Sequence, residues 1–445
     1  MPTALVISRY FPPLSSAGAS IRLVKFIKYI ASQDWKLIII TQDPDRTVVP
    51  EDRLSAFLEE EIPPETIIVR VPAPFSGKTS SSELENKAFQ PHTRRSGIST
   101  FLSGYIGRIV TRLFPGLSLW WGIRVFLLAL RNMKAWGVDL IYAVAPTFTN
   151  ALIGTMLRWF TGKPFVFDMK DDWVGSPAFQ QRPAWRRAIE RMLEAVIIKS
   201  AAQVVLATER SYRLYKERYL ANLDQKKFHF IPNGCDLAEF LPLRNRTEPP
   251  ASDKFLILSA AWGYQKDYRD ITPFFLGLGL FFRNNPSAQY DVDVVFLGNS
   301  LSPEYAELIK EVGLPMDCIK EIGPVARKEL VEWLWSSNLF FLVQPVGNTT
   351  AISGTLYEYW AVQKAPILLI AEEGASSRLV DENHLGKSFR FDEIMGIASY
   401  VEKIYQSHKN NQSQTITNKG IEAFDRKTLA LQMADIWRKS LVNNE

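Results

Sequence analysis

Short apolar runs alternate with segments of helical spacing along most of the chain. Ala4 to Ser8 and Leu37 to Thr41 are apolar enough for buried strands, and Ile21 to Ser32 between them repeats apolar residues at helical intervals. This order predicts a βαβ unit, whose crossover makes its strands parallel. The first half then repeats the pattern, with strands expected at Asp139–Ala145, Pro164–Asp168, Gln203–Ala207 and Phe228–Ile231 and a helix at Asn150–Phe160.

The second half begins the same pattern again after the polar, proline-containing run Leu241 to Lys254. Strands are expected at Phe255–Ser259, Asp291–Leu297, Ile319–Ile322, Leu339–Val343 and Pro366–Ile370, and helices at Pro303–Val312, Ala326–Ser336 and Leu356–Val362. A chain of 445 residues is too long for one core. We therefore predict an α/β protein with two parallel-sheet domains, at 1–245 and 246–415, followed by a helical segment at 416–445.

The stretch Gly347 to Ile370 is the strongest candidate for a ligand site. A loop of small residues, Thr349 to Gly354, opens a helix that carries Glu358 in its first turns. Unpaired backbone N–H groups at such a helix start attract an anion such as a pyrophosphate. A carboxylate one turn further on accepts hydrogen bonds from a ribose diol. The pattern thus predicts a sugar-nucleotide site, or else an ordinary connection with a solvated glutamate.

Composition and motifs argue against several other classes of protein. The chain has two cysteines and four histidines, all scattered, so neither a disulfide framework nor a metal site is predicted. No G-x-G-x-x-G follows a predicted strand, which argues against a dinucleotide dehydrogenase. A formal net charge of +5 without a nucleic-acid-binding signature argues against a nucleic-acid partner.

The segment 94–134 is basic and aromatic. No Asp or Glu occurs between Glu85 and Asp139, whereas Lys and Arg are interleaved there with large apolar residues. Such a stretch is typical of an anionic membrane surface, although two packed helices with a solvated basic face share the pattern. Neither a signal peptide nor an apolar run of membrane-spanning length is visible. We expect a cytoplasmic protein with peripheral contact at the inner face of the membrane through 94–134.

Two groups of charged residues follow predicted strands. Asp168, Asp171 and Trp173 come at the carboxyl end of a strand, where open α/β sheets bind ligands, and suit a polar substrate such as a sugar. A capping cluster for the next helix is the alternative. Lys266 and Arg269 follow the first strand of the second half, where cations neutralise a diphosphate or remain solvated surface charge.

Five segments together resemble the family 4 glycosyltransferases of the two-Rossmann-domain (GT-B) type. They are SRYFPP with SSAGAS, DMKDDW, FIPNGCD, EIGPVARKELVEWL and SGTLYEYWAVQKAPIL, in that family's order. The resemblance implies two Rossmann-like domains facing each other across a cleft, with the C-terminal helix packing back on the first. It also implies retaining sugar transfer from a nucleotide-sugar donor to a glycan or lipid-linked acceptor, without metal or other cofactor, in surface polysaccharide or glycolipid synthesis.

The resemblance implies a set of donor-binding residues. Glu358 matches the glutamate expected on the donor ribose, and Gly354 and Thr355 open the same helix. Gly18 matches the loop that approaches the donor phosphates, and Arg327 lies in the stretch that borders the base. Lys266 and Arg269 complete the expected donor site.

On the acceptor side, the box DMKDDW matches the family pattern D-x-R-D-x-W, with Lys170 in place of arginine. Asp168 and Asp171 are the expected catalytic residues, and Arg9 and Trp173 are expected beside the acceptor. No nucleophile is obvious, which suits attack by the acceptor on the leaving-group face.

Several positions depart from the family pattern. Many relatives have a further glutamate where this chain has Thr350, and often a lysine where it has Thr355. The loop after the second half's first strand keeps Gly263 as its only glycine. These changes leave open a non-catalytic GT-B protein that binds a nucleotide or glycan as a partner subunit. A sugar-nucleotide epimerase fits less well, because no acid and base pair suited to that chemistry is visible.

Overall fold

The computed structural model describes most of the chain and divides it into two compact units. The described residues are 1–14, 17–44, 53–73, 119–145, 147–175, 177–221, 223–244, 254–261, 263–298, 301–412, 416 and 420–442. Unit 1 comprises Met1–Glu51, Leu58–Pro232 and Ala430–Glu445, and unit 2 comprises Asp52–Phe57 and Asn233–Leu429. Each unit holds one parallel sheet with helices, so the predicted fold class of two parallel-sheet α/β domains is confirmed.

Unit 1 is a doubly wound α/β unit. Its strands are β1 (Thr3–Ile7), β2 (Lys36–Gln42), β3 (Ile67–Val71), β4 (Leu140–Val144), β5 (Phe165–Met169), β6 (Gln203–Leu206) and β7 (Phe228–Phe230). Its helices are α1 (Ala17–Ala31), α5 (Leu119–Asn132), α6 (Phe148–Thr161), α7 (Pro177–Gln180), α8 (Ala184–Ser200), α9 (Glu209–Tyr219) and the 3-10 turn η2 (Gln225–Lys227), while α2 (Arg53–Glu60) is divided between the units.

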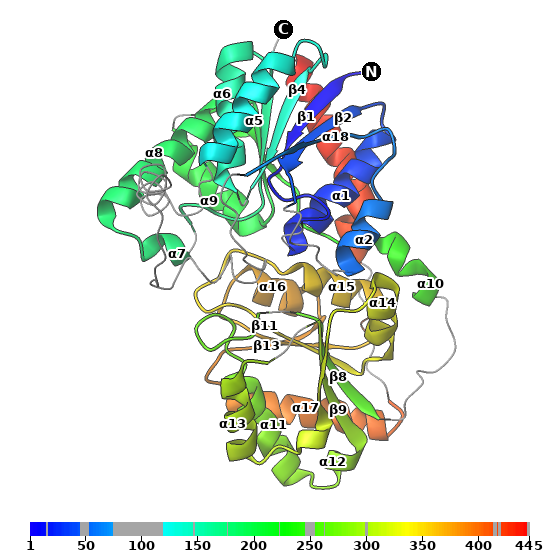
Figure 1. Cartoon of the computed structure of the whole chain (residues 1–445). Coiled ribbons are helices and arrows are strands. Elements are labelled where there is room, and N and C mark those ends of the chain that lie inside the picture. The colour runs from blue at the N-terminus through cyan, green and yellow to red at the C-terminus, as the bar shows by residue number, and fades with distance from the viewer. Residues whose placement is uncertain are drawn as a thin grey trace, which may run out of the picture. The chain divides into compact units, whose positions relative to one another are not determined.

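The seven strands of unit 1 pair in the order β3-β2-β1-β4-β5-β6-β7, all parallel. Helices cover both faces, with α5, α6 and α8 on one side and α1 on the other (Figure 1). All five residues of β1 and of β4 are buried, as continuous apolar runs in a sheet covered on both faces should be.

The chain's last helix, α18 (Arg426–Val442), belongs to unit 1 from Ala430 onward. Its Trp437 ring is fully buried, with its centroid 4.8 Å from that of Tyr142 and 5.1 Å from that of Trp35. These aromatic contacts bury the C-terminal helix against β4 and the residue before β2, and so tie the end of the chain to its beginning.

Unit 2 repeats the architecture with six strands. They are β8 (Phe255–Ser259), β9 (Val292–Leu297), β10 (Ile319–Ile322), β11 (Leu339–Val343), β12 (Ile367–Ile370) and β13 (Gly386–Phe389). The helices are α10 (Leu241–Arg244), α11 (Thr272–Asn284), α12 (Ala288–Asp291), α13 (Pro303–Val312), α14 (Arg327–Ser336), α15 (Gly354–Val362), α16 (Ala375–Glu382) and α17 (Ile394–Lys409), with 3-10 turns η3 (Leu237–Glu239), η4 (Met316–Cys318) and η5 (Gly420–Phe424). The parallel strand order is β10-β9-β8-β11-β12-β13.

The chain enters unit 2 at Asn233, earlier than the boundary expected at residue 245. The reason is that the residues just after it, including Cys235 and Phe240, are buried in the core of unit 2. Gly234 makes the passage possible: its φ is +56°, and a Cβ there would lie 2.2 Å from the carbonyl oxygen of Phe424. The PNG turn seen in the sequence is therefore a tight crossing of two backbones.

The segment expected to contact a membrane lies only partly within the described residues. Residues 94–118 fall outside them, and 119–132 form α5. Among the described helices, none is both long enough and apolar enough to cross a membrane.

Candidate functional site

Strand order indicates where a ligand is expected to bind in unit 2. The chain builds β9 on one side of β8 and β11 on the other, so the order of the sheet reverses between β8 and β11. In open α/β sheets, ligands bind outside the carboxyl ends of the strands at such a reversal. The loops that follow these two strands, at 260–271 and 344–353, are therefore the expected walls of a site.

The loop after β11 is held in place by the start of α16. The N–H of Ala375 donates to the Thr349 carbonyl at 2.8 Å, and the Ser376 hydroxyl donates to the Ala351 carbonyl at 3.0 Å. Gly374 has no room for a side chain, because a Cβ would lie 2.5 Å from the Thr349 carbonyl oxygen. These contacts fix the path along which the loop delivers the chain to α15.

The N-terminus of α15 is open. Within the described part of the chain, the N–H groups of Gly354 and Thr355 have no hydrogen-bond partner, and Ser353 makes no side-chain cap. A Cβ built on Gly354 would meet no atom within 4 Å. Unpaired N–H groups and the positive end of the helix dipole thus face free space, which is the geometry that binds phosphate.

Behind that helix start, Arg327 joins two carboxylates. Its Nη1 lies 2.7 Å from an oxygen of Glu358 on α15, and its Nε donates to Glu239 on η3 at 2.7 Å. All three side chains are largely buried, with 7% of Arg327, 11% of Glu358 and 12% of Glu239 exposed. Burial acts to lower the pKa of Arg327, but the charges of Glu358 and Glu239 outweigh it and raise that pKa.

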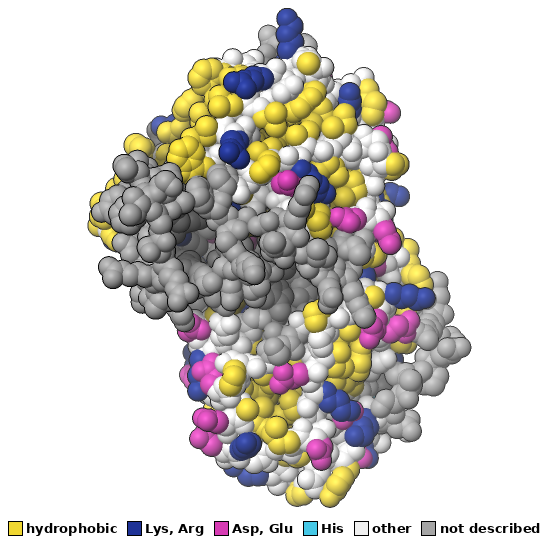
Figure 2. All heavy atoms as spheres, viewed as in Figure 1, with side chains coloured by type: hydrophobic (Ala, Val, Ile, Leu, Met, Phe, Trp, Pro, Cys, Tyr) yellow, Lys and Arg dark blue, Asp and Glu magenta, His cyan; other side chains and the backbone are white. Residues whose placement is uncertain are grey.

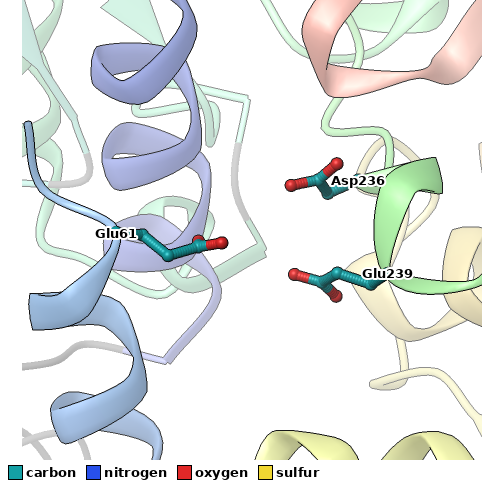
Figure 3. A group of neighbouring side chains, drawn as sticks. All are labelled: Glu61, Asp236 and Glu239. Carbon is teal, nitrogen blue, oxygen red and sulfur yellow. The ribbon is translucent and has the colours of Figure 1, made fainter.

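Figure 3 shows Asp236 and Glu239 projecting from the same short turn of unit 2. Asp236 caps this turn by accepting from the N–H of Ala238 at 3.3 Å, while Glu239 is taken up by Arg327. Glu61, the third residue drawn, belongs to unit 1 and pairs there with Lys25 and with Lys28, the latter at 2.9 Å. Each carboxylate therefore already has a partner within its own unit.

The loop after β8 lies beside α15. The N–H of Ala260 donates to the Tyr359 hydroxyl at 2.8 Å, which ties the start of this loop to the middle of the helix. Further along, Lys266 is exposed, and the Arg269 guanidinium lies 5.7 Å from the Tyr268 ring centroid. The structure thus places both predicted cations on the loop that follows β8, at the strand-order reversal.

In unit 1 the strand order reverses between β1 and β4. Arg9 follows β1 and donates from Nε to Gln42 at 2.7 Å, so this predicted acceptor-side residue stands at the edge where a ligand is expected. Gly18 lies in the first turn of α1, the helix that this same loop leads into.

Asp168 is sealed inside unit 1. It is 1% exposed, and its carboxylate accepts from the Tyr142 hydroxyl at 2.6 Å and from two nitrogens of Arg22 at 3.3 Å. Arg22 also contacts the Pro232 carbonyl at 2.5 Å. Burial, and then the Asp168 charge, raise the pKa of Tyr142 well above its ordinary value, so its proton stays in the hydrogen bond. The catalytic role of Asp168 stays a prediction, and its contacts are those of a structural residue.

Two other predicted residues of the DMKDDW box, Trp173 and Asp171, differ in burial. Trp173 is 4% exposed and stacks on Phe148, with ring centroids 4.3 Å apart. Asp171 is half-buried in the loop after β5. Of the two aspartates predicted to be catalytic, Asp171 is therefore the one within reach of a ligand.

Sequence reasoning missed the partners of these charged residues. Arg22 was not singled out, although it is a polar residue on a helix whose neighbours are apolar. Glu239 gave no signal, because it lies 88 residues from Arg327 in the chain. Charged residues at helix positions that should be buried are the one pattern that would have pointed to Arg22.

Comparison with known proteins bears on the fold. No protein-family model matches the sequence, and no curated protein sequence matches it. Among solved structures, sucrose-phosphate synthase from Thermosynechococcus elongatus is 15% identical, covers 100% of both chains and has a TM-score of 0.66. HepE from Anabaena, solved in complex with UDP-glucose, is 15% identical over 98% of this chain and 99% of its own, with a TM-score of 0.61.

The UDP-GlcNAc 2-epimerase of Methanocaldococcus jannaschii is also similar, at 12% identity over 97% of this chain and 100% of its own, with a TM-score of 0.55. A synthase and an epimerase thus share this architecture. The resemblance to GT-B glycosyltransferases is confirmed at the level of the fold, and the choice among activities rests on the site.

Proposed function

We propose that this chain is a glycosyltransferase that moves a sugar from a nucleotide-sugar donor to a glycan or lipid-linked acceptor. The observation that carries the proposal is the start of α15, where the free N–H groups of Gly354 and Thr355 face open space one turn before Glu358. This arrangement suits a donor whose diphosphate lies on the helix N-terminus and whose ribose hydroxyls donate to the carboxylate.

Transfer in such a site breaks the bond between the anomeric carbon and the diphosphate oxygen and forms one to the acceptor oxygen. The acceptor hydroxyl loses its proton, and negative charge develops on the departing diphosphate. We propose that α15 stabilises this charge together with Lys266 and Arg269, without a metal ion. Retention at the anomeric carbon follows if the acceptor attacks on the leaving-group face.

Acceptor binding is proposed for unit 1, at the reversal between β1 and β4. Arg9 and Asp171 are both partly exposed there, whereas Asp168 and Trp173 are buried. A hexose donor and a role in surface polysaccharide or glycolipid synthesis, at the inner face of the membrane, complete the proposal.

A second candidate is a non-catalytic subunit that binds a nucleotide or a glycan. It is favoured by the pairing of Glu358 with Arg327. It is also favoured by Thr350 and Thr355, because the resemblance to family 4 glycosyltransferases implies charged groups at these two positions. Binding without turnover would distinguish this candidate from the transferase.

The test is a thermal-shift screen of the purified protein against UDP-, GDP- and ADP-sugars, followed by measurement of released nucleoside diphosphate. A ligand that binds only the folded state raises the melting temperature by mass action. One donor should stabilise the protein, and adding glycan or lipid acceptors should release its nucleotide. Stabilisation without release would establish the binding-only subunit, and no stabilisation by any donor would reject both the transferase and a subunit that binds a nucleotide.

Two variants make the test specific to the site. Glu358→Gln and Glu239→Gln each remove one of the two carboxylates on Arg327, and their exposures are nearly equal, at 11% and 12%. Both should therefore destabilise unit 2 by a similar amount, about 1–2 kcal/mol. Only Glu358→Gln should lower donor affinity, by about tenfold or more for a lost charged hydrogen bond. Equal losses of affinity would remove Glu358 from the proposed donor site.

A further inference from the structure

One side of unit 1 carries an unusual density of exposed apolar side chains. Six of them, each about half exposed or more, lie on α5, α6 and α8: Trp120, Ile123, Trp159, Phe160, Trp185 and Met192. Isolated exposed apolar residues are ordinary, whereas a group of three tryptophans and a phenylalanine on neighbouring helices marks an interaction surface. We call these residues the α5–α6–α8 face.

The three helices form one continuous surface. The rings of Phe126 on α5 and Phe160 on α6 lie 5.5 Å apart. The indole N–H of Trp159 donates to the Ser200 hydroxyl at the end of α8, at 3.1 Å. Figure 2 shows yellow apolar side chains interspersed with dark blue Lys and Arg over the part of unit 1 where α5 and α6 run.

The charge on this face has one sign. Helices α5 and α6 contain no Asp or Glu. The two acids of α8, Glu190 and Glu194, are 2% and 1% exposed and pair inward with arginines. The exposed charged side chains of these helices are therefore basic, and they are Arg124, Arg131, Arg191 and Lys199. Asp139, in the loop before β4, is half-exposed and lies 3.5 Å from Lys163.

We propose that the α5–α6–α8 face docks on an anionic lipid membrane. Tryptophan and phenylalanine partition into the region between headgroups and acyl chains, and arginine and lysine beside them contact anionic headgroups. Of the segment 94–134, this surface includes residues of α5, and α6 and α8 contribute the rest.

Charge argues against the other occupants. A second copy of this chain, docking the same face against itself, would bring basic side chains together without acidic partners. A nucleic acid would satisfy the arginines, but it would leave the exposed aromatic rings of α6 without an apolar environment. The proposal goes beyond sugar transfer and does not depend on it, because binding to a membrane requires no donor.

The experiment is sedimentation of the full-length protein with vesicles of phosphatidylcholine alone or of phosphatidylcholine with phosphatidylglycerol. The protein should bind the anionic vesicles and only weakly the neutral ones, and rising salt should weaken that binding. The variant Trp159→Ser/Phe160→Ser should lose affinity by about tenfold or more. Its side chains are 62% and 67% exposed, so its melting temperature should stay close to that of the parent.

A matched control comes from unit 2, where Tyr290→Ser/Met395→Ser removes side chains that are 72% and 76% exposed. This variant should bind vesicles like the parent, while Arg124→Glu/Arg131→Glu should lose selectivity for anionic lipid. Equal binding by the parent and the Trp159→Ser/Phe160→Ser variant would overturn the proposal, as would absence of binding to anionic vesicles. Self-association of the parent that the same variant abolishes would instead assign the face to a second copy of the chain.

Discussion

Both units contain a buried arginine paired with a carboxylate near the carboxyl edge of their sheet, but the two pairs have different surroundings. In unit 1, the side chains of Arg22 and Asp168 are 2% and 1% exposed, and Tyr142 and the Pro232 carbonyl take up the remaining polar atoms. In unit 2, Arg327 is shared between Glu358 and Glu239. The first pair is closed on all sides, whereas the second keeps a carboxylate one turn from the open start of α15.

Under the proposed function, this difference gives the two ion pairs different roles. A sealed ion pair loses its hydration, and only its mutual attraction and its hydrogen bonds within the protein offset that loss. The pair in unit 1 therefore contributes to packing and has no free polar atom for a ligand. A carboxylate whose arginine has a second partner can exchange one contact for a ligand hydroxyl without leaving the arginine unpaired. The identity of the residues in a buried pair therefore says less about function than the partners around them.

The largest effect is expected when the sealed pair is broken. Asp168→Ala leaves the Arg22 guanidinium buried without its carboxylate, which should destabilise unit 1 by about 3–5 kcal/mol. The loss in the free energy of unfolding is measured by urea unfolding, with hydrogen exchange of backbone amides in peptides from unit 1 as the signal. Arg213→Ala is the control, because Arg213 and its partner Glu209 are 68% and 60% exposed and their pair should contribute less than about 1 kcal/mol. A loss as small as that of the control would mean that the pair is not sealed.

A smaller loss is expected from Arg327→Met. This change leaves Glu239 and Glu358 facing each other without the cation, but both keep some exposure to water, so unit 2 should lose about 2–3 kcal/mol. Donor affinity should fall as well, because Glu358 loses the contact that orients it. Backbone amides in peptides from unit 1 should exchange hydrogen at the same rates as in the parent protein. Loss of stability in unit 1 instead would break the comparison, since it would show that the two pairs are not independent.

Three strands of unit 2, β8, β10 and β11, begin and end at the predicted residues. β8 and β11 are buried throughout, so their apolar runs stand out from their neighbours. β10 is an edge strand, and it was recognised although two of its four residues are exposed. The two strands that pattern analysis missed, β3 and β13, lie at the edges of their sheets and contain exposed or half-buried residues. A strand that is partly solvated has no continuous apolar run to detect.

For the candidate site, local features were predictable and distant contacts were not. Gly354 and Glu358 stand four residues apart on one helix, so their spacing alone predicted a helix start with a carboxylate on the next turn. The pairing of Arg22 with Asp168 joins residues 146 positions apart, which no local pattern reveals. Asp168 and Trp173 were expected beside a ligand because the carboxyl ends of strands attract ligands, and tertiary packing placed both in the core.

Substitution of two glycines, Gly374 and Gly354, distinguishes a packing contact from a proposed ligand contact near α15. Gly374→Ala would place a Cβ 2.8 Å from the Cα of Thr349, so the loop must shift, at a cost of about 1–3 kcal/mol. Gly354→Ala meets no neighbour and should leave the melting temperature unchanged or slightly higher. It should nevertheless weaken donor binding several-fold, because the new methyl occupies the space proposed for phosphate. Unchanged donor affinity in the Gly354→Ala variant would mean that the donor phosphates do not bind next to Gly354.

The smallest effect concerns a third buried carboxylate, Glu194 in unit 1. It accepts from the Tyr215 hydroxyl at 2.6 Å and from the N–H of Val174 at 3.1 Å, and it pairs with Arg218 at 2.9 Å. Burial nevertheless raises the pKa of Glu194 above its ordinary value of 4.5. This carboxylate is therefore not fully compensated by its partners.

A raised pKa means that the folded state binds the proton more tightly than the unfolded state. The stabilising contribution of Glu194 is then complete below pH 4.5 and is lost as the pH rises through the folded-state pKa. Glu194→Gln keeps an acceptor for Tyr215 but does not titrate. We expect this variant to destabilise unit 1 more at pH 4 than at pH 7, which urea unfolding at the two pH values measures. An equal loss at both pH values would mean that the charge of Arg218 offsets the burial of Glu194.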